Sequence, residues 1–434
     1  MVILYSVLLF ITLIYSKFKY YTIFTHVSIF IGVNIISIFL MYGILGIDSK
    51  LSIGIHLRII GMFVFFIIGS FFGDFKYKFK NKNLNYNKYT DLVRLKYAII
   101  VLSIVYNIFS FIYLYRLHSS YGISNIMNNL STINQAFQNE DFKLGFSYYV
   151  LPIGVPLSLM ILFYKNKTKC SNLIYIQYLL CYIQCISPRR DTLFFMFGMT
   201  LMYSILIKSG LNISNKSMES IKRFLKVSSI ICLAVFIMSY TQVAMNKSYK
   251  SDFILYGLNI PASLKDSLLY ITGNYAYLNK LDILGQLKFN FPFISTFRLF
   301  YRYIIEGLFK INIDTVTCFN LQFFNIGSSE YILFNTAPLF YYIYIESGFL
   351  WWLSFIIIGF ISSKAYYLIS ENRNSIGCIM LSLFQFDILL FSFRSYNLIY
   401  LSHILVLIYI IIIYLIVEKK EVVNCRKERS GENL

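Results

Sequence analysis

Two adjacent arginines stand in a short turn between apolar stretches, in the sequence Ser187-Pro188-Arg189-Arg190-Asp191. The guanidinium group presents its N–H donors in a planar fork that matches phosphate oxygens, so a pair of arginines suits a pyrophosphate. The alternative is a helical-hairpin turn in which Asp191 caps the next helix and the arginines contact lipid headgroups. We therefore take Arg189, Arg190 and Asp191 as candidates for binding a pyrophosphate.

A second pair of arginines has the spacing of one helix face. Arg298, Arg302 and Glu306 follow one another at intervals of four residues, and Tyr301 lies beside them. Residues four apart lie on the same face of an α-helix, so the pattern would place two cations and a carboxylate together. An interfacial amphipathic helix, with snorkelling arginines and an Arg302–Glu306 pair, explains the same pattern without a ligand.

Two further charged residues lie near the ends of apolar stretches. Glu346 is about two turns into an expected helix, and Arg394 stands in a short turn between the last two expected helices. Ionisable groups in or beside a bilayer are costly to bury, which makes them candidates for function. Glu346 could act as a general base or neutralise a nearby arginine.

The chain that carries these residues is too apolar for a soluble fold. Of its 434 residues, 58% are hydrophobic and only 14% are charged, against roughly 25% charged in ordinary soluble domains. A soluble fold has too little interior for this much apolar side chain. The composition also excludes disordered, collagen-like, coiled-coil and disulfide-rich secreted proteins. We expect the chain to lie in a lipid bilayer.

Apolar runs close to the roughly 20 residues needed to cross the hydrocarbon layer recur along the chain. They predict an all-α, polytopic integral membrane protein, with a single membrane domain over residues 1–434 and about eleven transmembrane helices. The expected helices cover residues 2–16, 21–47, 51–73, 97–115, 146–164, 173–187, 192–207, 227–244, 338–363, 376–393 and 398–417.

The distribution of Lys and Arg predicts the orientation of these helices. With the N-terminus outside and a cytoplasmic tail at 418–434, the inner segments hold 24 basic residues in 83 positions, against 14 in 134 positions outside. This asymmetry follows the positive-inside rule, so the net charge of +19 does not call for a nucleic-acid partner. The large outer loops are then 116–145 and 245–337, and a loop as long as the second is expected to be functional.

Patterns for metals and nucleotides are missing from the sequence. The seven cysteines and four histidines have no metal-ligand spacing. The sequence also lacks a Walker A motif, a Rossmann glycine pattern and a GxSxG motif. We therefore expect no metal and no cofactor.

Two short segments carry a family resemblance. The first is Pro188-Arg189-Arg190-Asp191-Thr192-Leu193, which opens a helix, and the second is Asn335-Thr336 followed by Tyr344-Ile345-Glu346-Ser347-Gly348 after the large outer loop. Together with the helix count and the late outer loop, they resemble the bacterial oligosaccharide repeat-unit polymerases, the Wzy-type polymerases of O-antigen and capsule. One departure is that the Arg-x10-Gly pattern described for such polymerases is shorter here, with eight residues between arginine and glycine.

The resemblance implies a glycosyltransferase in the bacterial cytoplasmic membrane. Such an enzyme transfers a glycan from undecaprenyl pyrophosphate onto a new lipid-linked repeat unit at the outer face, in O-antigen or capsular polysaccharide biosynthesis. Membrane lipids and a protein that regulates chain length are expected partners. On this hypothesis the catalytic residues are Arg190, Arg298, Arg302 and Glu346, and the substrate-binding residues are Arg189, Asp191, Tyr301, Glu306 and Arg394.

Two other functions use similar residues. A flippase for lipid-linked oligosaccharide would need a basic internal cavity, and such transporters usually show related halves and charges along several helices. Here the charges gather at the expected outer rim, which favours the polymerase. An O-antigen ligase-like transferase would share the arginine chemistry and differ in its acceptor, so the sequence separates it poorly from a polymerase.

Overall fold

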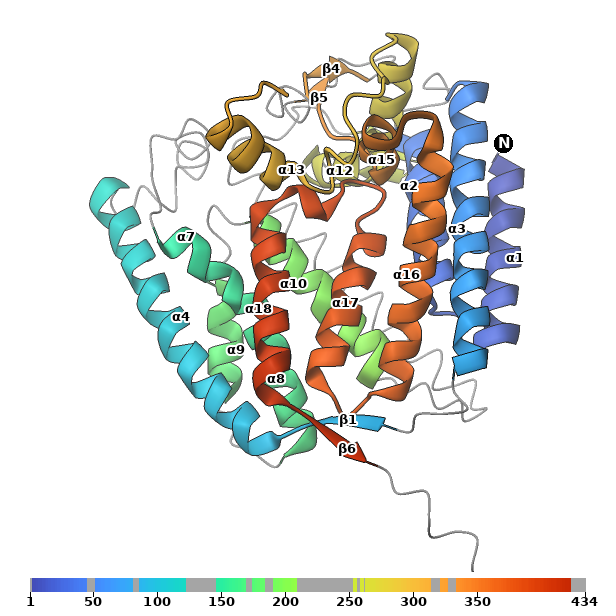
Figure 1. Cartoon of the computed structure of the whole chain (residues 1–434). Helices are drawn as coiled ribbons and strands as arrows, with labels where there is room; N and C mark the ends of the chain where they lie inside the picture. Colours follow the sequence, from blue (N-terminus) through green and yellow to red (C-terminus); the bar gives the residue numbers. More distant parts are fainter. Residues whose placement is uncertain are drawn as a thin grey trace, which may run out of the picture.

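The computed structural model describes residues 2–44, 51–80, 86–121, 146–168, 174–183, 190–208, 253–255, 258–260, 262–313, 321–326 and 333–422. These residues form mostly helices, and the longest ones stand side by side as an upright bundle (Figure 1). The helices of the first half are α1 (Val2–Tyr20), α2 (His26–Ile44), α3 (Ile53–Lys80), α4 (Leu92–Tyr121), α7 (Ser147–Val150), α8 (Gly154–Lys167), α9 (Ile174–Ile183) and α10 (Arg190–Tyr203).

The second half adds further long helices and several short turns. Its helices are α12 (Ala262–Ile283), α13 (Arg298–Phe300), α15 (Leu339–Ser347), α16 (Trp351–Glu371), α17 (Ile376–Leu390) and α18 (Leu401–Val417). Short 3₁₀ turns are η1 (Leu151–Ile153), η4 (Gly348–Leu350) and η5 (Asn397–Ile399), and π-helical segments are η2 (Ser204–Lys208) and η3 (Tyr301–Leu308).

Three small antiparallel sheets accompany the helices, each with two strands. They pair β1 (Tyr86–Thr90) with β6 (Glu418–Val422), β2 (Phe253–Leu255) with β3 (Leu258–Ile260), and β4 (Phe324–Asn325) with β5 (Leu333–Phe334).

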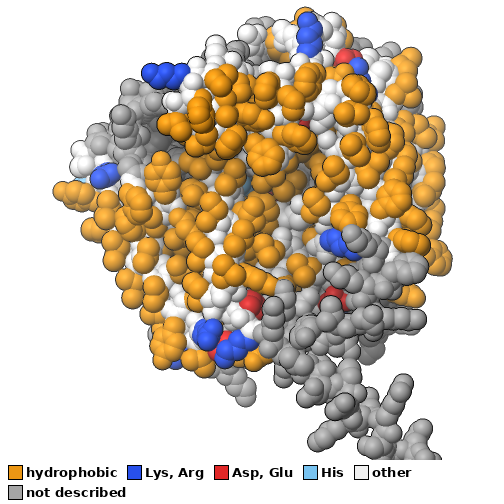
Figure 2. Space-filling model, viewed as in Figure 1, with side chains coloured by type: hydrophobic (Ala, Val, Ile, Leu, Met, Phe, Trp, Pro, Cys, Tyr) orange, Lys and Arg blue, Asp and Glu red, His pale blue; other side chains and the backbone are white. Residues whose placement is uncertain are grey.

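The helices have the length and surface of a membrane-embedded protein. Five segments of the described chain are long and apolar enough to cross a membrane, namely Ile3–Tyr20, His26–Gly43, Ile53–Phe75, Leu92–Arg116 and Leu339–Glu371. In Figure 2, hydrophobic side chains cover most of the middle of the visible face, and charged side chains lie mainly toward its upper and lower ends. Helix is present in ten of the eleven expected ranges, and the range 227–244 lies outside the described residues.

The bundle has two distinct ends. The elements between α12 and α15 gather at the upper end in Figure 1, and the N-terminal end of α1 points the same way. Strands β1 and β6 lie at the lower end. The described part of the large predicted outer loop and strand β6 are therefore at opposite ends of the bundle.

Helices α3 and α16 pack against each other more extensively than any other pair of helices that the structure describes. A Cβ atom placed on Gly69 would collide with the backbone carbonyl of Ile356, and one placed on Gly359 would collide with the carbonyl of Phe66. Small residues let two helix backbones approach closely, and this packing is a main source of association between helices in lipid. The two glycines therefore fix how α16 lies against α3.

The expected helix 338–363 is interrupted. It divides at Gly348, which has φ of +56° and ends α15, and α16 begins only after the 3₁₀ turn η4. A residue without a Cβ adopts this left-handed backbone with little penalty. Glu346 consequently lies near the end of a short helix rather than inside a long one.

The expected loop 245–337 contains a long buried helix. Helix α12 has 22 residues and packs mainly against α2. Tyr275, Tyr277 and Leu278 are fully buried in it. The loop is therefore anchored in the bundle by one of its own helices.

At the lower end, β1 and β6 join the start of α4 to the end of α18. Thr90 donates from its backbone N–H to Asn374 and from its hydroxyl to Glu418. The Asp91 backbone N–H donates to Val417 at 3.0 Å, and Lys419 forms an ion pair of 2.6 Å with the Asp91 carboxylate. We call this sheet and its contacts the lower latch.

Candidate functional site

The segment that leads into α13 is fastened onto α15 by backbone contacts. The Asn290 N–H donates to the carbonyl of Ile345 at 2.8 Å, and the Phe293 N–H donates to the carbonyl of Glu346 at 3.3 Å. These bonds reach the carbonyls at the end of α15, which have no partner within the helix. The connection fixes where the arginine-bearing segment 298–308 begins.

Glu346 uses its side chain in the same connection. Its carboxylate accepts from the Thr296 backbone N–H at 2.9 Å and from the Thr296 hydroxyl at 3.1 and 3.2 Å. The residue is only 5% exposed. Among the described residues, its bonds come from neutral donors and not from an arginine. Glu346 is therefore held in place by Thr296, and not by the arginine that the sequence suggested as its partner.

The Thr296 hydroxyl links Glu346 to the turn before α18. It lies 3.0 Å from the hydroxyl of Tyr396, which is 6% exposed. Burial, together with the negative charge of Glu346, raises the pKa of Tyr396, so this hydroxyl stays protonated and can donate. We call Thr296, Arg298, Tyr342, Glu346 and Tyr396 the upper-end cluster.

Arg298 is the cation of the upper-end cluster. It is half-buried, and its Nη1 is 3.5 Å from the carbonyl of Ile399. Burial lowers the pKa of Arg298, and repulsion from Arg302 acts in the same direction, while Tyr400 and Tyr342 oppose the change. An arginine guanidinium is not deprotonated in proteins, so Arg298 remains a cation. Arg298 thus places a partly desolvated positive charge among tyrosines.

The residues that follow Arg298 continue as a helix that is wider than an α-helix. Tyr301–Leu308 is π-helical, so its backbone bonds reach five residues along the chain. Arg302 and Glu306 are half-buried, and the Arg302 guanidinium lies over the ring of Tyr303 at 5.7 Å. The Tyr301 hydroxyl donates to the carbonyl of Pro292 at 3.0 Å. The segment that carries Arg302 and Glu306 is therefore helical, but it is not the α-helix for which the four-residue spacing predicted one shared face.

Arg394 lies in the turn after α17, close along the chain to Tyr396. Its backbone N–H donates to the carbonyl of Phe391 at 2.9 Å, and the carbonyl of Ser392 accepts from the Leu339 N–H at 2.7 Å. The turn is thereby bonded to the start of α15. Three segments, the one before α13, helix α15 and this turn, meet at the upper-end cluster.

The first arginine pair is described only in part. Arg190 begins α10, which packs against α17, α8 and α18 inside the bundle. The side chains of Arg190 and Asp191 and the whole of Arg189 lie outside the described residues. Their predicted contact with a pyrophosphate stays a prediction.

Sequence reasoning missed a polar network that anchors α12. The Tyr275 hydroxyl donates to Asn34 Oδ1 at 2.5 Å, and Asn34 Nδ2 donates to the hydroxyl of Ser392 at 2.7 Å. Asn274 accepts from the hydroxyl of Thr336 at 2.7 Å. Single Asn, Tyr and Ser residues in apolar runs carry no spacing signal, so only the structure reveals their pairing. The network ties α2, α12 and the turn that contains Ser392 together.

An ion pair adds to this anchoring. Arg58 of α3 donates to Asp282 of α12 at 2.6 Å, and its guanidinium lies over the ring of Tyr344 at 5.3 Å. Both charged side chains are partly exposed. The contacts of Arg58 join α3, α12 and α15.

A second buried carboxylate lies at the other end of the bundle. Asp74 of α3 accepts from the Tyr20 hydroxyl at 2.6 Å and from the Ser363 hydroxyl at 2.5 Å, and it pairs with Lys19. These residues come from α1, α3 and α16. The satisfied carboxylate holds three helices together, far from the upper-end cluster.

Groups that could bind a metal are missing from the part of the chain that the structure describes. No cluster of three or more His, Cys, Asp or Glu residues occurs there. The cations available at the upper end of the described structure are arginines and lysines.

Comparison of the chain with protein-family models, with curated proteins and with solved structures found no match.

Proposed function

We propose that this chain is a glycosyltransferase that polymerises oligosaccharide repeat units carried on undecaprenyl pyrophosphate. The reaction would take place at the outer face of the bacterial cytoplasmic membrane, in O-antigen or capsule biosynthesis. The proposal includes about eleven membrane-spanning helices with the upper end of the bundle outside, and a partner protein that sets chain length.

One observation carries the proposal. Thr296 binds the buried carboxylate of Glu346, and the partly desolvated Arg298 follows Thr296 by two residues with Arg302 as its charged neighbour. These residues lie at the end of the bundle opposite the C-terminal strand (Figure 1). A charge placed in a partly desolvated site acts more strongly on a ligand than the same charge in water. The arrangement supports binding of an anionic group beside a sugar at the membrane surface.

The proposed reaction needs two chemical functions. A hydroxyl of the acceptor sugar attacks the anomeric carbon of the donor glycan, the bond from that carbon to the pyrophosphate oxygen breaks, and undecaprenyl pyrophosphate leaves. Arg298 and Arg302 would stabilise the leaving pyrophosphate, and Glu346 or Glu306 would take the proton of the attacking hydroxyl. Arg189, Arg190 and Asp191 would hold a second pyrophosphate, and Tyr301 and Arg394 would contact the sugars.

The residue assignments can be tested with the purified protein. Full-length protein in detergent is given synthetic lipid-linked repeat units, and the products are resolved on a gel. Arg298→Lys and Arg302→Lys keep the charge and lose the planar fork, so we expect each to reduce the rate by about 10- to 100-fold, as expected when about 1.4–2.8 kcal/mol of contact is lost. Lys310→Gln, an exposed residue further along the segment, should leave the rate unchanged.

Glu346→Gln tests whether Glu346 acts as the general base without removing its hydrogen bond to Thr296. Glutamine keeps an oxygen that can accept from Thr296, so unfolding temperature should change little while the rate falls. Normal polymerisation by Glu346→Gln would assign the proton transfer to Glu306 or to another group. Normal polymerisation by the double variant Arg189→Ala/Arg190→Ala would refute the assignment of that pair.

The other functions give different results in a gene deletion. A glycan ladder that collapses to one repeat unit on its acceptor supports a polymerase. Loss of all surface glycan with lipid-linked units held at the inner face would indicate a flippase, and polymer left on its lipid carrier would indicate a ligase. An unchanged ladder would exclude all three.

A further inference from the structure

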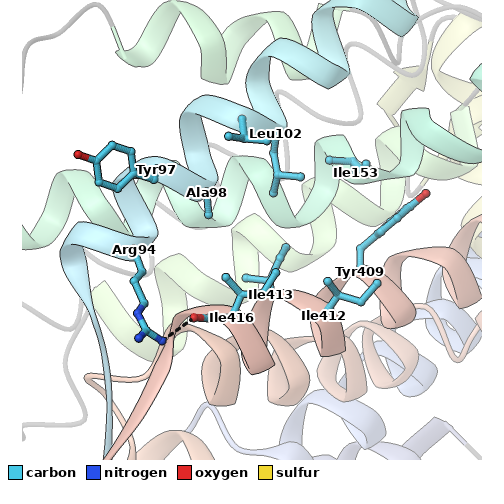
Figure 3. A pocket seen from close by; sticks show the side chains of 10 residues that line it. Arg94, Tyr97, Ala98, Leu102, Ile153, Tyr409, Ile412, Ile413 and Ile416 are labelled. Carbon is cyan, nitrogen blue, oxygen red and sulfur yellow. Dashed lines mark hydrogen bonds between the residues drawn. The ribbon is translucent and has the colours of Figure 1, made fainter.

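A groove runs along the outside of the bundle between α4 and α18. It has a volume of about 510 Å³ and is lined almost wholly by apolar side chains. Figure 3 shows Tyr97, Ala98 and Leu102 of α4 facing Ile412, Ile413 and Ile416 of α18, with Arg94 at one end. The floor includes the buried residues Ile153 and Ile413, and the walls are exposed. The groove therefore opens sideways, toward the surroundings of the bundle.

The length of the groove matches one leaflet of a membrane. From Arg94 to Leu102 the lining of α4 covers eight residue steps, or about 12 Å at 1.5 Å per residue. Half of a typical hydrocarbon core is about 15 Å thick. An acyl chain from a single leaflet is thus long enough to fill the groove, starting from the end that carries Arg94.

The end of the groove that carries Arg94 is basic. Arg94 follows the lower latch along the chain, and segments 86–95 and 418–422 together contain four Lys or Arg residues and three Asp or Glu residues, a net charge of +1. The positive-inside rule places these segments at the cytoplasmic face. A headgroup at this end would belong to a lipid of the inner leaflet, where anionic lipids attract basic segments.

Arg94 retains capacity for a ligand. Its side chain is 54% exposed, its Nε is 3.6 Å from Asp91, and its Nη1 makes a long bond of 3.4 Å to the carbonyl of Ile416. Asp91 has a closer partner in Lys419, at 2.6 Å. A guanidinium has five N–H donors, so most of those on Arg94 are left for solvent or an anionic oxygen.

We propose that this groove is a binding site for an anionic glycerophospholipid of the inner leaflet. One acyl chain lies between α4 and α18, and the phosphate lies against Arg94. The inference goes beyond the proposed glycan reaction, because a pyrophosphate-linked sugar at the outer face cannot also reach Arg94 at the opposite end of the bundle.

Native mass spectrometry of the full chain in detergent tests this site. The protein is incubated with phosphatidylglycerol or with phosphatidylcholine of the same acyl chains, and bound lipid is counted. We expect one tightly held phosphatidylglycerol, retained about five-fold better than phosphatidylcholine, which corresponds to about 1 kcal/mol from one basic residue. Equal retention of the two lipids would overturn the role of Arg94.

Matched variants separate the headgroup from the groove. Arg94→Gln should abolish the preference for phosphatidylglycerol, and Val101→Trp, which fills the groove from an exposed wall position, should abolish retention of either lipid. The controls Lys96→Gln and Ile108→Trp change a neighbouring charge and a lipid-facing position outside the groove, and both should behave like the unaltered protein. Retention by Val101→Trp would refute the proposed site, and so would displacement of phosphatidylglycerol by an equal amount of a polyprenyl phosphate.

Discussion

Replacing Asn34 with leucine removes the centre of the network that anchors α12. Asn34→Leu takes away the acceptor of the Tyr275 hydroxyl and the donor to Ser392, at a position that is 1% exposed. Leucine has the same number of side-chain heavy atoms and branches at Cγ like asparagine, so it is the apolar residue closest to it in shape. The main effect is a buried tyrosine hydroxyl without its acceptor.

The size of the effect follows from these contacts. Leaving a buried polar group without a partner costs about 1–3 kcal/mol, whereas hydrogen bonds between membrane helices contribute about 0.6 kcal/mol on average and about 1.7 kcal/mol at most. We expect Asn34→Leu to lower the free energy of unfolding by about 2 kcal/mol. Adding Tyr275→Phe removes the stranded hydroxyl, so the double variant should be less destabilised than the sum of the two single variants by about 0.6–1.7 kcal/mol.

The assay is unfolding in mixed micelles with increasing sodium dodecyl sulfate, followed by circular dichroism. Tyr115→Phe serves as control, because its side chain is 63% exposed on α4, and it should change the free energy of unfolding by less than about 0.5 kcal/mol. Additive effects of Asn34→Leu and Tyr275→Phe would show that the two side chains are not coupled. The account of how α12 is held would then be wrong.

Two other predictions concern the helix contact and the lower latch. Gly359→Ala should destabilise the protein by about 1–3 kcal/mol, since the new methyl group meets the α3 backbone. The control Gly32→Ala should not destabilise it, because the new Cβ would be 3.9 Å from its nearest neighbour. Equal effects of the two variants in the same unfolding assay would contradict the proposed contact. The Lys419 ammonium lowers the pKa of the Asp91 carboxyl. The Asp91–Lys419 pair therefore stabilises the fold above the ordinary carboxyl pKa, and this stabilisation is lost as the pH falls through the lowered pKa. The protection factors of the β1 amides, which correct for the intrinsic pH dependence of hydrogen exchange, should fall in that acidic range, and Lys419→Gln should reduce this fall. Protection factors that do not change with pH would argue against the pair.

The helices were largely predictable from the sequence, and their interruptions were not. Long apolar runs identify segments such as α3 and α4 because length and hydropathy alone decide whether a helix suits a bilayer. The division at Gly348 was missed because the apolar run continues on both sides of it. Helix α12 was missed because Lys265, Asp266 and Asp282 give it the composition of a surface loop, although Asp282 is paired with Arg58.

Some residues of the candidate site could also be predicted from the sequence, and others could not. Arg298, Arg302 and Glu346 could be singled out because charges are rare in this chain and conspicuous near apolar runs. Thr296 and Tyr396 could not, since a neutral hydroxyl has no signature until its partner is known. Their bonds depend on three segments that are separated in the sequence, and such pairing is decided by tertiary packing.

The lower latch has a consequence for the synthesis of the protein. Strand β1 ends at Thr90 and its partner β6 begins at Glu418, so about three quarters of the chain must be made between them. At a translation rate of about 5–20 residues per second, tens of seconds pass between the synthesis of β1 and that of β6. During this time the hydrogen-bonding edge of β1 lacks the partner strand β6. The start of α4 is therefore fixed against α18 only after residues 418–422 have been made. A ribosome that stops before residue 418 leaves a chain whose α4 lacks this attachment, which gives quality-control proteases a way to recognise an incomplete protein.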